Sequence, residues 1–141
     1  MSKIKQAIVG GAIGTAVMTG FMMITPMMGF PKMEPATMLS GIMGIHIGLG
    51  WAIHFTIGII FALGYALLII NWLHRISNII VKGAVFGVLA WAIAQAAFAG
   101  MGAMMGGLPP PPEEGIGMMM VGGVLNHAVF GIVVGIIVKG E

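Results

Sequence analysis

Four long apolar runs, separated by short polar or proline-rich stretches, make up most of the chain. They cover about residues 5–28, 44–70, 79–101 and 118–138. Each run reaches the roughly 20 residues that an α-helix needs to cross the hydrocarbon core of a bilayer. The pattern predicts an all-α fold, a four-helix transmembrane bundle that forms a single integral membrane domain over residues 1–141.

Prolines mark the ends of these runs. Pro26 and Pro31 close the first predicted helix, because proline lacks the backbone N–H and disfavours helix in the residue before it. Pro35 is well placed to open a short lead-in helix over residues 36–45, ahead of the second span. The run Pro109 to Pro112 predicts an extended connection between the third and fourth helices.

Most of the positive charges fall at one end of the predicted bundle. The termini and the turn between the second and third helices carry all the lysine and arginine residues except Lys32: Lys3, Lys5, Arg75, Lys82 and Lys139. Short loops rich in lysine and arginine stay in the cytoplasm. We therefore expect both termini to be cytoplasmic and both proline-bearing loops to lie outside.

The chain also repeats itself. Placing Lys5 on Lys82 sets Gly10 on Gly87, and placing Gly50 on Gly123 sets His54 on His127. The first two predicted helices therefore resemble a hairpin that is duplicated as the last two. Two-helix units return the chain to its starting side, so the copies are parallel. We expect the two histidines at similar depth in the membrane.

The composition restricts the chemistry that the protein can perform. The chain is 59% hydrophobic and 7% charged, whereas soluble domains carry about 25% charged residues. It has no cysteine and no aspartate, and its four glutamates fall in predicted loops or at the terminus. Thiolate sites and a Ser-His-Asp triad are thus excluded, and a net charge of +2 gives no reason to expect nucleic acid. The sequence predicts a protein that is not an enzyme.

Several short motifs resemble those of a family of small bacterial four-helix membrane proteins that is known only as a domain of unknown function. The motifs are Gly14 to Thr19, Pro26 to Pro31, Gly50 to His54, Lys82 to Gly87 and His127 to Gly131. The resemblance covers nearly the whole chain. It implies the four-helix fold and a bacterial inner (cytoplasmic) membrane location, and it implies no activity.

Two histidines stand in matching frames of the form G-x3-H-x3-G. The frames are Gly50, His54, Gly58 and Gly123, His127, Gly131. Positions four apart share a helix face, and an ionisable group inside the membrane is a functional-site hypothesis by default. One hypothesis is therefore a haem b protein with two axial imidazoles, serving electron transfer or acting as a subunit of a larger complex. Trp51 would pack against the ring edge and Asn126 would orient an imidazole.

Methionine gives a second hypothesis. The chain has fifteen methionines, most of them around the two predicted outer loops. Thioethers are soft ligands that select Cu(I), whereas the alternative is that methionine is only a flexible apolar filler. In this hypothesis, Cu(I) binds to the outer methionine clusters or passes through them, and His54 and His127 are binding sites deeper in the membrane. The candidate outer ligands are Met23, Met27, Met101, Met105 and His46.

A third hypothesis is a scaffold or assembly subunit without a cofactor, whose histidines only join helices. Glycines spaced by four recur on several helices, including Gly10/Gly14 and Gly83/Gly87. Such spacing lets membrane helices approach closely. We expect a homo-oligomer or a subunit of a larger membrane complex, with these pairs at the contact.

Overall fold

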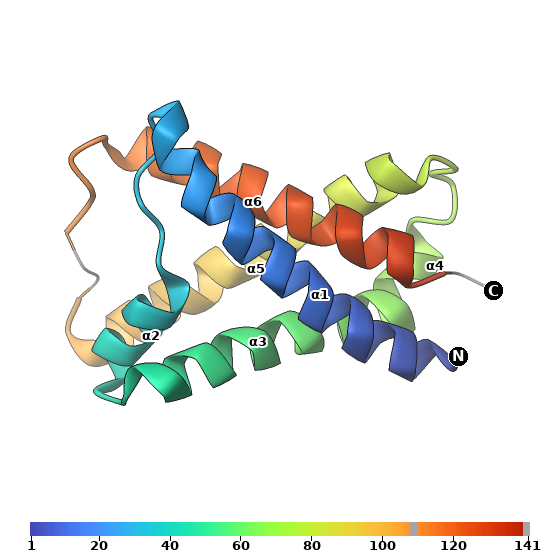
Figure 1. The fold of residues 1–141 in the computed structure, drawn as a ribbon, viewed down its shortest axis with the longest axis horizontal. Helices are drawn as coiled ribbons and strands as arrows, with labels where there is room; N and C mark the ends of the chain where they lie inside the picture. The colour runs from blue at the N-terminus through green and yellow to red at the C-terminus, as the bar shows by residue number, and fades with distance from the viewer. Residues whose placement is uncertain (108–109, 140–141) are drawn as a thin grey trace.

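A computed structural model describes residues 1–107 and 110–139 (Figure 1). The described residues form helices and no strands. In chain order the elements are α1 (Lys3–Ile24), η1 (Thr25–Met28), α2 (Pro35–Met43), α3 (Ile47–Gly64), η2 (Tyr65–Ile69), α4 (Ile70–Trp72), α5 (Ile79–Met105) and α6 (Ile116–Ile137). The predicted proline connection begins at Pro109, which lies outside the described residues.

The described part of the chain contains four helical spans long and apolar enough to cross a membrane: Lys3–Met28, Ile47–Trp72, Ile79–Met105 and Ile116–Ile137. Their outward faces carry exposed isoleucine, leucine and valine. Such surfaces are stable in lipid and not in water. The protein is therefore a multi-pass membrane protein with a helical-bundle fold, as the hydrophobic pattern predicts.

The helix boundaries follow local chemistry. Asn78 begins α5, its side-chain Oδ1 accepting the N–H groups of Ile80 and Val81. This helix runs one turn beyond the predicted end and stops where Gly106 adopts a φ of 89°, a conformation that glycine reaches without strain. The lead-in segment is a separate helix, α2, which Pro35 opens as predicted and which ends at Met43, with Gly44 as its C-cap.

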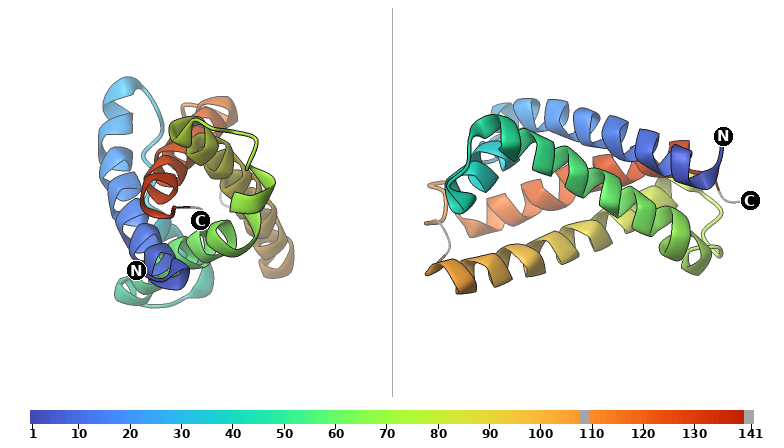
Figure 2. Two further views of the ribbon diagram at one scale, coloured as in Figure 1. Left: turned by 90° about the vertical axis from the view of Figure 1, so that its right-hand side faces the viewer. Right: turned by 90° about the horizontal axis from the view of Figure 1, so that it is seen from below.

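The long helices pack in the spatial order α3, α1, α6, α5. Helix α6 contacts both α1 and α5, α3 packs on α1, and α2 packs on α3, whereas α3 and α5 make almost no contact. Figure 2 shows this arrangement along the bundle and from the side. The duplication predicts two equivalent contacts between the hairpins, and only the one between α1 and α6 is extensive.

Glycines form the crossings within each hairpin. A Cβ on Gly11 would lie 2.6 Å from the Cα of Ile59 in α3, and a Cβ on Gly83 would lie 2.6 Å from the Cα of Ile132 in α6. Between the hairpins, the Gly10/Gly14 pair meets side chains at the C-terminal end of α6, those of Val138 just after the helix and of Phe130 respectively, and Gly87 meets the α6 backbone as Gly83 does. The expectation that these pairs contact a partner molecule is therefore wrong, because they pack helices within the chain.

Three aromatic rings fill the bundle at the end that carries both termini. Tyr65, Phe86 and Phe130 are fully or almost fully buried. The ring centroids lie 4.6 Å apart for Tyr65 and Phe86, and 6.1 Å apart for Phe86 and Phe130. The π-helical stretch η2 carries Tyr65. This aromatic core links η2, α5 and α6.

Candidate functional site

His54 is buried in α3, and a threonine of α1 holds it. The Thr19 Oγ1 lies 3.2 Å from the His54 Nε2 and 2.8 Å from the Thr15 carbonyl oxygen. A hydroxyl has one proton, and a carbonyl only accepts. The hydroxyl therefore donates to Thr15 and accepts from the Nε2–H of His54, which leaves the lone pair of this neutral imidazole on Nδ1.

His127 has the opposite arrangement. Its Nδ1 lies 2.9 Å from the carbonyl oxygen of Gly123 in the preceding turn of α6. Since a carbonyl only accepts, Nδ1 carries the proton and Nε2 holds the free lone pair. The structure thus places the two predicted histidines on α3 and α6, two helices that make almost no direct contact, with His54 buried and His127 half-buried.

The glycines of the two histidine frames are covered by neighbouring elements. A Cβ on Gly50 would meet Ser40 and Ala36 of α2, and one on Gly58 would meet Thr15 of α1. Two glycines of α6 are covered by α5. Trp91 of α5 packs on Gly123, where a Cβ would lie 2.7 Å from the indole Nε1, and the backbone of α5 packs on Gly131. These glycines serve helix packing, so they do not leave the smooth open surface that the haem hypothesis expects beside each histidine.

The aromatic and amide neighbours also differ from the expectation. Trp51 lies edge-on to His54 with ring centroids 6.1 Å apart. Asn126 is completely buried, and its Nδ2 donates to the sulfur of Met33 at 3.4 Å rather than to an imidazole. Its Oδ1 has no hydrogen-bond partner among the described residues. An amide flip would not help, because a thioether can only accept.

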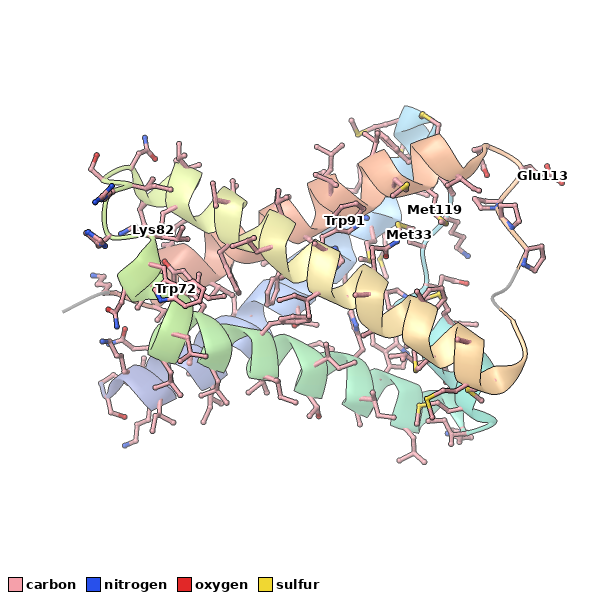
Figure 3. The ribbon with its side chains drawn as sticks, turned by 180° about the vertical axis from the view of Figure 1, so that it is seen from behind. Met33, Trp72, Lys82, Trp91, Glu113 and Met119 are labelled. Carbon is pink, nitrogen blue, oxygen red and sulfur yellow. The ribbon has the colours of Figure 1, made fainter. Side chains whose placement is uncertain are left out.

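A pocket lies next to His54, between the last turns of α1, the loop before α2, and the first turns of α2 and α3. Its volume is about 280 Å³, and its lining includes Thr19, Met22, Met23, Met33 and Trp51. We call it the thioether pocket. Figure 3 shows Met33, on the loop between η1 and α2, pointing into the molecule. Lys32 and Glu34, which also line the pocket, form an exposed ion pair at 2.9 Å, so its mouth carries no net charge.

The other predicted metal ligands do not gather in this pocket. Met105 and Met38 line a second, more open pocket on the α2 side of the end of α5. Met27 is 87% exposed, and Met101 lines neither pocket. His46 begins α3 instead, its Nδ1 accepting the backbone N–H of Gly48 at 3.0 Å. Of the predicted outer ligands, only Met23 lines the thioether pocket together with Thr19 and Trp51, the two residues next to His54.

Within residues 1–107 and 110–139, no three histidine or carboxylate side chains come together as a metal site. The soft donors Met22 and Met33 and the contact residue Thr19 were not singled out as site residues from the sequence. One signal was available, because Thr15 and Thr19 lie four apart in an otherwise apolar helix. Two hydroxyls on one face of a membrane helix indicate a polar partner on a neighbouring helix.

Comparison with known proteins gives a family and no function. No curated protein matches the chain, and no solved structure matches it. One family model, described as a family of unknown function (DUF6789), matches residues 1–140. This bears out the resemblance seen in the short motifs, and the chain belongs to the family of unknown function DUF6789.

Proposed function

We propose that the protein is a non-enzymatic membrane protein that binds Cu(I) in the thioether pocket. The observation that carries the proposal is that Met22, Met23 and Met33 line one cavity. Thioether sulfurs are soft donors that select Cu(I) over harder cations. The cavity provides three such sulfurs. Neither cysteine nor aspartate occurs in the chain.

Two of the three thioethers are fixed before any metal arrives. Met22 is only 4% exposed and belongs to the core between the helices. Met33 is tied to α6 through the N–H of Asn126, and a thioether that accepts one hydrogen bond keeps a second lone pair for a metal. Ligands held in place by surrounding contacts bind more tightly, because less conformational freedom is lost.

The charge distribution supports an outward-facing pocket. Lys3, Lys5, Arg75 and Lys82 lie at or near the ends of helices opposite the pocket, where positive charge favours the cytoplasmic side. The pocket then opens to the outside, which is the periplasm if the membrane is the inner membrane of a Gram-negative bacterium. Assembly into a homo-oligomer or a larger complex stays a prediction.

The affinity for Cu(I) tests the proposal. We expect the double variant Met22→Leu/Met33→Leu to bind Cu(I) about 100-fold more weakly, since one residue that holds or supports a metal is worth roughly 10- to 100-fold. Leucine keeps the volume and removes the sulfur. The measurement is competition with a chromophoric Cu(I) chelator in detergent, under anaerobic reducing conditions. Equal affinities of the variant and the wild type would overturn the proposal.

A matched control uses two methionines outside both pockets. Met27 and Met104 are 87% and 88% exposed and line neither pocket. The variant Met27→Leu/Met104→Leu removes the same number of sulfurs from the same end of the protein. Its affinity for Cu(I) should equal that of the wild type. A loss as large as in the pocket variant would mean that exposed methionines bind the metal.

The haem hypothesis has weaker support, because neighbouring helices cover the glycines beside both histidines. A porphyrin needs an open face that these contacts occupy. We expect protein produced with added haem to show no Soret band. A Soret band that disappears in both His54→Ala and His127→Ala would replace the Cu(I) proposal with a haem protein.

A further inference from the structure

Trp51 lines the thioether pocket near the start of α3. Its indole is the one aromatic ring among the described residues of the pocket wall, and it shares the cavity with the thioethers of Met22, Met23 and Met33. The side chain is 39% exposed. Its neighbours in the protein therefore leave part of the ring uncovered.

Neighbouring rings hold the indole in place. His54, one turn later in α3, lies at a centroid distance of 6.1 Å with an angle of 67° between the ring planes, and Phe55 lies at 6.4 Å. The imidazole of His54 is itself buried and hydrogen-bonded to Thr19 of α1, which also lines the pocket. The indole is thus positioned before any ion binds, and less conformational freedom is lost on binding.

The other described groups of the pocket wall leave the charge of a bound monovalent cation uncompensated. Thioethers are uncharged ligands, and the carboxylate of Glu34 is paired with Lys32 at 2.9 Å. Carboxylate oxygens also suit harder cations such as Mg²⁺ and Ca²⁺ rather than Cu(I). The face of an indole attracts cations through the quadrupole of its ring and carries no formal charge. Trp51 therefore supplies the kind of electron-rich surface that the thioethers lack.

We infer that the indole of Trp51 is part of the Cu(I) site and holds the ion by a cation–π contact beside the thioethers, which deepens the proposed function and rests on it. The dimensions of the pocket allow this contact. Its volume is about 280 Å³, and a sphere of that volume has a radius of about 4 Å, whereas a cation–π contact reaches about 6 Å from the ring centroid. An ion bound to the sulfurs therefore stays within reach of the ring. The metal remains Cu(I), and no covalent bond breaks and no proton moves.

The affinity for Cu(I) gives the first test, by competition with a chromophoric chelator in detergent under anaerobic reducing conditions. We expect Trp51→Leu to bind Cu(I) about 10-fold more weakly than the wild type, and Trp51→Phe to lie between the two, because the cation–π attraction is strongest for tryptophan. The control is Trp72→Leu. Trp72 is 81% exposed, lies at the other end of the bundle from Met33 (Figure 3) and lines neither pocket. Its replacement should leave the affinity unchanged.

Tryptophan fluorescence gives a second readout, which a change in packing alone would not move. We expect titration with Cu(I) to quench part of the tryptophan emission of the wild-type protein. The quenching should persist in Trp72→Phe and disappear in Trp51→Phe, although Trp51→Phe keeps an aromatic ring and still binds the ion. Trp91, which packs on Gly123 of α6 and lines neither pocket, is present in both variants.

The outcomes separate this inference from the proposed function. Wild-type affinity in Trp51→Leu, or an affinity of Trp51→Phe no higher than that of Trp51→Leu, overturns the cation–π contact and leaves the thioether site intact. An emission that Cu(I) leaves unchanged in the wild type, or quenching that persists in Trp51→Phe, also overturns it. A wild-type protein that binds no Cu(I) removes both. Because the wild-type titration needs no variant and Trp51→Phe is a conservative change, the test holds even if Trp51→Leu folds poorly.

Discussion

Replacing Gly131 by alanine is expected to destabilise the protein by about 3 kcal/mol or more, the upper range for overpacking a tight interface. A Cβ on Gly131 would lie 2.5 Å from the backbone nitrogen of Gly87 and 2.6 Å from its Cα. Backbone atoms of a regular helix cannot move aside as a flexible side chain can. One methyl group should therefore separate α5 from α6 at their closest point. Loss of helical circular dichroism during titration with sodium dodecyl sulfate measures the effect.

The control is the same substitution at a glycine in open space. Gly100 lies in the C-terminal part of α5, and no atom lies within 4 Å of where its Cβ would be. Because alanine favours helix more than glycine does, Gly100→Ala should leave stability unchanged or raise it by up to about 1 kcal/mol. The two variants should thus differ in sign. If both behave alike, the glycine crossing does not determine the stability of the bundle.

Replacing Phe86 by alanine should have the second largest effect. The side chain is completely buried and packs against Tyr65 and Phe130. Phe→Ala in a soluble core costs about 3–5 kcal/mol. In a bilayer the transfer of the ring from water contributes less, because lipid is also apolar, so we expect about 2–3 kcal/mol from lost packing. The same titration in detergent measures it.

This variant also separates stability from binding. The aromatic core is remote from the thioether pocket, and none of its residues lines it. Phe86→Ala should therefore bind Cu(I) at the thioethers with wild-type affinity while unfolding more easily. Leu89→Ala, on the exposed face of the same helix, should change neither property. A Cu(I) affinity that falls with Phe86→Ala would show that the pocket depends on the core beneath it.

The sequence predicts the four spans because each must satisfy its backbone hydrogen bonds within lipid, which requires long apolar helices. Pro35 similarly predicts α2. The outcome for glycine shows the limit of such reasoning. Two glycines spaced by four residues indicate a close helix contact, but the pattern does not say which helix makes that contact. Gly10 and Gly83 face α6 of the same chain, although the spacing fits a partner molecule equally well.

The candidate site shows the same limit. The G-x3-H-x3-G frames predict that each histidine lies beside close helix contacts, and that inference needs only helical periodicity; His54 is buried and His127 half-buried. The neighbours of the histidines depend on tertiary packing. Thr19 reaches His54 across 35 positions in the chain, and Asn126 reaches Met33 across 93. The selection of Met22 and Met33 over Met27 and Met101 likewise follows from how the loop before α2 folds onto α6, which no local pattern encodes.

The most direct test of the thioether pocket is the copper K-edge spectrum of the wild-type protein loaded with Cu(I) in lipid nanodiscs. The account predicts retained copper with sulfur in its first coordination shell, and a smaller sulfur contribution in Met22→Leu/Met33→Leu but not in Met27→Leu/Met104→Leu. A first shell of nitrogen and oxygen alone, or a wild-type protein that releases all its copper on passage through a chelating column, would contradict it.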